Sequence, residues 1–126
     1  MKLKNLLTAA TASMIIFGTQ AFATEAPVKK ADGILVAASG MTLYVFDKDA
    51  SGSGKSTCNG PCAALWPALK ADDGDNAAGD YTIIARDDGT RQWALKGKPL
   101  YFWANDKKPG DKTGDNFKEV WHVVPQ

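Results

Sequence analysis

The stretch Leu43-Tyr44-Val45-Phe46-Asp47-Lys48-Asp49 decides the fold, because it returns 57 residues later as Leu100-Tyr101-Phe102-Trp103-Ala104-Asn105-Asp106. Both copies follow the pattern Leu-Tyr-x-aromatic-x-x-Asp. Successive residues of a strand point to opposite faces, so each copy predicts a strand that is apolar on both sides. The recurrence indicates that one structural unit is used twice.

The start of the chain predicts a secretory signal peptide over residues 1–23. Lys2 and Lys4 precede a short apolar run, and Ala21-Phe22-Ala23 provides small residues before the cut. The run is too short for a membrane span, and nothing later is long and apolar enough to be one. We therefore expect a periplasmic or secreted protein. A lipid anchor would need a cysteine at the cleavage point, so we expect a free form.

Composition predicts one domain with no affinity for nucleic acid. Removal of the signal takes away Lys2 and Lys4, which leaves 15 − 2 = 13 basic against 14 acidic side chains. The remaining lysines form isolated pairs beside acidic residues rather than a basic patch. We expect a monomer whose partner is a small ligand or another envelope protein.

Turn signals divide the rest into short strands and predict an all-β fold, a small β-sandwich or barrel of two pseudo-symmetric repeats. Residues 24–33 carry no periodic pattern and are expected to be flexible. The β-domain then covers residues 34–124, with repeats at about 34–69 and 81–124. Ser39-Gly40 predicts a two-residue hairpin turn in the first repeat.

Two further segments of the domain are predicted to be strands, each carrying a tryptophan. The first covers residues 63–69, where Pro67 favours an edge position or a bend. The second covers residues 117–124 and closes the chain. Helix should be minor, because no window keeps apolar residues at a 3.6-residue spacing.

Cys58 and Cys62 are predicted to form a disulfide, because export places them where such bonds persist. Asn59-Gly60-Pro61 between them is a strong turn sequence that brings the two sulfurs together. A loop this short constrains the unfolded chain by about 2 kcal/mol on the entropy model. The bond is therefore expected to be a local clip.

Asp49 and Asp106 hold the same place in the two copies, just past an apolar strand. One interpretation is that each carboxylate accepts backbone N–H groups and fixes the turn that follows. The alternative is a catalytic pair brought together by symmetry. We favour the turn role, because the motif provides no nucleophile or base.

Two metal sites are conceivable. His122 with Cys58, Cys62 and Met41 has the donor types of a copper site, and the acidic loops at 72–80 and 106–115 have oxygen donors for calcium. The disulfide and solvated Asx turns explain these residues better. We predict no catalytic residue, no metal ligand and no cofactor.

The aromatic residues of the two copies, Tyr44, Phe46, Tyr101 and Trp103, are expected in the core by their period, together with three further tryptophans. The alternative, a row of exposed rings, would make a stacking platform for a sugar or a protein.

These residues resemble a known bacterial family. Tyr44-Val45-Phe46-Asp47-Lys48-Asp49 and Tyr101-Phe102-Trp103-Ala104-Asn105-Asp106 are similar to the Tyr-x-(Phe/Trp/Tyr)-x-x-Asp signature of the "secreted repeat of unknown function" family, also described as predicted lipoproteins. The stretch from Cys58 to Pro67 resembles its cysteine-pair segment. The resemblance implies structural roles for the motif residues and no established reaction. We therefore expect a non-enzymatic binding module, or alternatively a redox or metal-handling protein.

Overall fold

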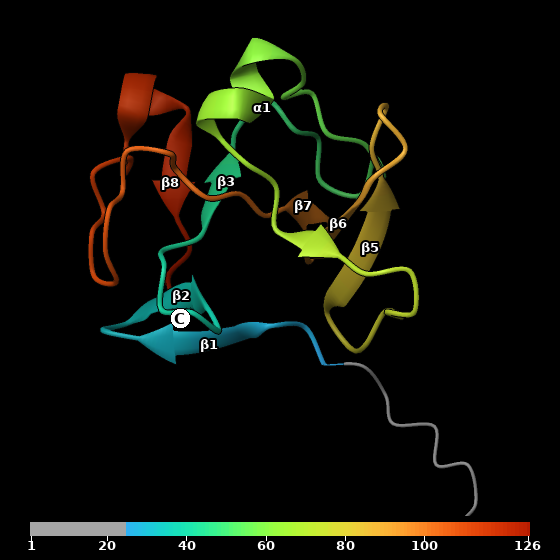
Figure 1. Cartoon of the computed structure of the whole chain (residues 1–126), viewed down its shortest axis with the longest axis horizontal. Coiled ribbons are helices and arrows are strands. Elements are labelled where there is room, and N and C mark those ends of the chain that lie inside the picture. Colours follow the sequence, from blue (N-terminus) through green and yellow to red (C-terminus); the bar gives the residue numbers. More distant parts are fainter. Residues whose placement is uncertain (1–24) are drawn as a thin grey trace, which may run out of the picture.

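The computed structural model describes residues 25–126, so the predicted signal peptide lies outside the described residues. Figure 1 shows short strands in small sheets and one short helix. The all-β fold of two repeats is confirmed. The elements are β1 (Val28–Ala31), β2 (Ile34–Ala37), β3 (Tyr44–Phe46), α1 (Pro61–Leu65), β4 (Lys70–Ala71), β5 (Tyr81–Ala85), β6 (Arg91–Leu95), β7 (Lys98–Pro99), the 3₁₀ turn η1 (Phe117–Glu119) and β8 (Trp121–Val123).

The first hairpin begins earlier than the sequence indicated. β1 lies within the segment 24–33 that was expected to be flexible, and it pairs with β2 along its whole length. Asp32 and Gly33 connect the strands with φ angles of 52° and 80°, as a tight hairpin turn requires. Val28 of β1 packs against the core. The strand has only four residues, which are too few to show an alternating pattern in the sequence.

The turn after β2 contains three residues rather than the predicted two. The Ala37 N–H donates to the Met41 carbonyl, so residues 38–40 form the connection. The equivalent turn between β6 and β7 has two residues, Lys96 and Gly97. The offset between equivalent residues is therefore 58 before these turns and 57 after them, so that Leu35 of β2 corresponds to Trp93 of β6.

The repeats exchange their final segments. β3 of the first repeat pairs with β8 of the second, while Tyr101 of the second repeat forms a bridge with Ala68 of the first. Between them, Tyr44 and Tyr101 donate their backbone N–H groups to each other's carbonyls, at 2.8 and 3.0 Å. Each repeat thus completes the sheet of the other around a pseudo-two-fold axis.

Two segments that were predicted to be strands differ in the structure. Residues 63–69 contain no strand, because helix α1 runs from Pro61 to Leu65 and the next strand, β4, begins only at Lys70. Proline suits the first turn of a helix because its missing N–H would have no helical partner there. In residues 117–124, Lys118 and Glu119 have positive φ angles, so the strand begins only at Trp121.

The core has two parts, one on each face of the central strands. On one face lie Leu43 and Leu100 with Leu35, Leu69 and Trp93. On the other face four rings stack in a row, and the order is Phe46, Trp121, Trp66 and Trp103. Their centroids are separated by 4.1, 3.8 and 4.1 Å in turn. The aromatic residues of both motif copies are therefore buried in the core, as their spacing along the strands predicted.

The ring stack leaves no room beside Gly114. A Cβ atom there would lie 2.8 Å from Cη2 of Trp66 and 2.9 Å from Cγ of Trp103. Gly114→Ala is expected to lower the free energy of unfolding by about 1–3 kcal/mol, because the rings must shift. Urea denaturation with tryptophan fluorescence measures the change. Gly74→Ala is the matched control, since nothing lies within 4 Å of its Cβ; an equal loss in both variants would contradict the prediction.

Candidate functional site

The tyrosines and aspartates of the two motif copies bond across the repeats. The Tyr44 hydroxyl donates to Oδ2 of Asp106 at 2.7 Å, and the Tyr101 hydroxyl donates to Oδ2 of Asp49 at 2.5 Å. All four side chains are buried. The motif therefore joins the two repeats instead of acting within each one.

The second oxygen of each aspartate holds the loop that follows its own strand. Oδ1 of Asp49 accepts the backbone N–H and the hydroxyl of Thr57, both at 2.7 Å. Oδ1 of Asp106 accepts the same two groups of Thr113, at 2.9 and 2.7 Å. Each carboxylate thus accepts a backbone N–H group of the loop after its own strand, as the turn interpretation requires. The two carboxylates lie in separate networks rather than as a pair sharing one site.

Burial raises the pKa of both motif tyrosines above the ordinary value of about 10. The hydrogen bonds to Asp106 and Asp49 raise the pKa values further, because a phenolate beside a carboxylate is unfavourable. Both hydroxyls therefore remain protonated donors at neutral pH.

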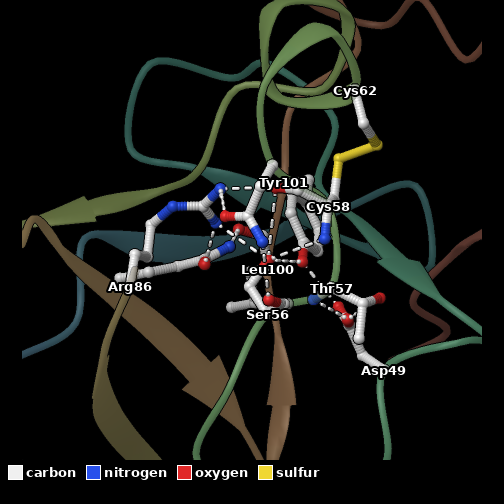
Figure 2. Close-up of a disulfide and its surroundings, with 10 residues drawn as sticks. Asp49, Ser56, Thr57, Cys58, Cys62, Arg86, Leu100 and Tyr101 are labelled. Atoms are coloured by element: carbon white, nitrogen blue, oxygen red, sulfur yellow. Dashed lines mark hydrogen bonds between the residues drawn. A yellow bond between two sulfur atoms is a disulfide. The ribbon is translucent and has the colours of Figure 1, made fainter. Parts of the chain in front are cut away.

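A buried arginine extends one of the two networks (Figure 2). The Arg86 Nη1 donates to Oγ of Ser56 at 3.0 Å and to Oε1 of Gln92 at 2.6 Å, while Nη2 donates to the carbonyl of Cys58 at 2.5 Å. Ser56 in turn contacts the Tyr101 hydroxyl at 2.6 Å. Sequence reasoning missed Arg86 because an arginine beside Asp87-Asp88-Gly89 resembles an ordinary solvated turn.

The predicted disulfide between Cys58 and Cys62 is confirmed. Cys58 is fully buried and packs in the aromatic part of the core, whereas Cys62 lies half-buried in α1. Figure 2 shows the bond linking the Ser56–Cys58 segment to the helix above it. Arg86 and the disulfide therefore hold the same loop, one from each side.

The residues considered for metals do not come together. His122 is partly exposed, with Nε2 at 2.8 Å from Oδ2 of Asp47. In the acidic loop, the Arg91 guanidinium donates to the carbonyls of Asp72, Asp73 and Asp75. Within residues 25–126 no group of three or more His, Cys, Asp or Glu side chains is arranged to hold a metal ion.

An open cleft lies between the first hairpin and the loop that follows the second motif copy. Its volume is about 340 Å³. Two lysines and one aspartate, Lys29, Lys112 and Asp32, contribute its charges. Its other lining residues are small or apolar: Ala31, Ile34, Val36, Gly40, Thr42, Pro109 and Gly110. Sequence reasoning did not find this site, because the two walls come from different repeats.

Backbone contacts identify the counterpart of this cleft in the second repeat. The Leu35 N–H donates to the carbonyl of Val124, as the Trp93 N–H donates to that of Leu69. The preceding residue in each strand is then Ile34 in the first repeat and Gln92 in the second. In the loops, Ser56 precedes Thr57 as Lys112 precedes the equivalent Thr113.

The counterpart is occupied by the protein's own side chain. Gln92 and Ser56 stand where the cleft has Ile34 and Lys112, and the guanidinium of Arg86 lies between them. A hollow of about 170 Å³ remains beside Arg86. The same scaffold is thus filled by an arginine in one repeat and open in the other.

The tyrosine pKa values predict an alkaline limit of stability. A raised pKa means that the folded state holds the proton more tightly, so its stabilisation is complete below pH 10 and is lost as pH rises above it. The free energy of unfolding should fall by about 1.4 kcal/mol per pH unit for each motif tyrosine.

Urea denaturation from pH 8 to pH 11.5 measures this slope. Tyr44→Phe and Tyr101→Phe should each reduce this slope by about 1.4 kcal/mol per pH unit, because each variant removes one titrating group. Absorbance at 295 nm provides the check: deprotonation of all three tyrosines near pH 10 while the fold persists would contradict the prediction.

Removal of the disulfide should weaken the fold without abolishing it. The double variant Cys58→Ala, Cys62→Ala is expected to lose about 2 kcal/mol of unfolding free energy through the added freedom of the unfolded loop. Near-ultraviolet circular dichroism should keep the signature of the stacked tryptophans. A variant without that signature would show that the bond organises the whole core.

Comparisons with known proteins agree with this architecture. The family model described as "secreted repeat of unknown function" matches residues 26–70 and 82–125, one match for each repeat. No curated protein and no solved structure matches the chain. In the part of the chain from residue 25 onward, no helix is both long and apolar enough to cross a membrane. The two matches cover most of the chain, which therefore belongs to this family of secreted repeats.

Proposed function

We propose that the protein is a non-enzymatic binding module of the bacterial envelope, periplasmic or secreted, and that the cleft beside β1 and β2 is its binding site. One observation carries the proposal: the cleft remains open where its counterpart is filled by Arg86. Its volume of about 340 Å³ suits a small ligand. Stability of the duplicated scaffold does not require so large an opening, because the second repeat fills the equivalent space with Arg86 and keeps a hollow of only about 170 Å³.

The remaining polar groups support binding rather than catalysis. The motif carboxylates, hydroxyls and Arg86 bond one another in the interior, and Ser56, Asp49 and Tyr101 are each less than a tenth exposed. Such a network fixes the repeats together and presents no reactive group to a substrate. The redox alternative has less support, since Cys58 is fully buried.

The test is ligand-observed NMR of the mature protein with a fragment library, by saturation transfer. Ala31→Trp should abolish the signals of most binding fragments, because the indole fills the cleft that Ala31 lines. The matched control is Ala50→Trp, which places the same indole on an exposed loop outside the cleft. Fragments that bind wild type and Ala31→Trp equally would overturn the proposal.

A further inference from the structure

We infer that the cleft takes a small organic anion, a carboxylate on a short apolar chain. This inference rests on the proposed function, because it names the ligand class of the same site. It follows from the charges at the cleft, from its apolar lining and from the comparison with the filled counterpart.

The charges favour an anion. The cleft is lined by Lys29 and Lys112 against the single carboxylate of Asp32. Within residues 25–126, neither lysine lies within ion-pairing distance of a carboxylate. The two lysines come from opposite walls, one from β1 and one from the loop after the second motif. An anionic group between them contacts both walls.

In the counterpart, hydrogen-bond acceptors hold a cation, and the cleft lacks two of these acceptors. Arg86 is held by the oxygen atoms of Ser56, Gln92 and Cys58. In the cleft, Lys112 replaces the serine and Ile34 replaces the glutamine. The two replacements remove two acceptors and add a positive charge, which reverses the preferred ligand charge.

The lining sets the rest of the ligand. Beneath the lysines lie Ala31, Ile34, Val36 and the ring of Pro109, and these present carbon atoms to an occupant. An apolar chain gains free energy by leaving water for such a surface. A volume of about 340 Å³ equals that of about eleven water molecules in the liquid, so the chain must be short.

The test uses hexanoate and its uncharged match, hexanamide, with ¹⁵N-labelled mature protein. Hexanoate should shift the amide signals of Gly40, Gly110 and Lys112, and hexanamide should bind about tenfold more weakly. Lys29→Gln and Lys112→Gln should each weaken hexanoate about fivefold without changing hexanamide. Raising the salt concentration should weaken hexanoate alone.

Lys30→Gln is the matched control. Lys30 neighbours Lys29 on β1 but does not line the cleft, so its variant should bind hexanoate like the wild type. If both probes bind equally and Ala31→Trp removes both, the binding site stands and the anion inference fails. If neither probe shifts the cleft amides, the inference fails; the fragment screen then decides the proposed function independently. If Lys30→Gln weakens hexanoate as much as Lys29→Gln, general surface charge explains the effect and the inference fails.

Discussion

The reciprocal bonds between Tyr44 and Asp106 and between Tyr101 and Asp49 are the constraint on which the structure depends. Each bond joins the strand of one repeat to the loop of the other. A buried carboxylate is costly unless its oxygens are satisfied, and here three donors satisfy each one. Moving one repeat relative to the other would break both bonds at once, so the polar contacts specify a single arrangement.

The ring stack follows from that arrangement. Once Tyr44 and Tyr101 face each other, Trp66 and Trp121 meet across the same pseudo-axis with their planes 1° apart. Tyr44 and Trp66 pack in a T-shaped arrangement, and so do Tyr101 and Trp121. Such offset and edge-on contacts add to the free energy gained from burying the rings. The ring stack is therefore symmetric about the pseudo-axis, whereas the repeats differ where Leu35 corresponds to Trp93 and where Ile34 corresponds to Gln92.

The two copies differ in how they fill the equivalent cavity. In the hairpin of β5 and β6, the strand pairing extends to Arg86 before the chain turns. The Arg86 side chain then donates a hydrogen bond to the carbonyl of Cys58 in the disulfide loop. In the first hairpin, Asp32-Gly33 turns the chain earlier, and no residue reaches so far. One copy closes its cavity with a guanidinium, while the other leaves a lysine-edged opening.

Much of this could be predicted from the sequence, for identifiable reasons. The repeat, the buried aromatics and the disulfide were visible because the same letters recur and the cysteines flank a strong turn. Helix α1 was missed because five residues are too few to show a helical period. The crossing of Tyr44 to Asp106 was missed because spacing along a chain does not tell which copy of an aspartate a tyrosine meets. Arg86 was missed because burial of a turn residue depends on a loop about thirty residues earlier.

The exchange of final segments has a consequence for the order in which the two halves of the chain can fold. Residues 121–126 finish the sheet of the first repeat: the Leu35 N–H bonds to Val124, and the Gln126 N–H bonds to Gly33. Contacts between positions so distant form slowly, because a long loop must close first. The sheet of the amino-terminal half therefore stays incomplete until the carboxyl-terminal residues are free to pair with it.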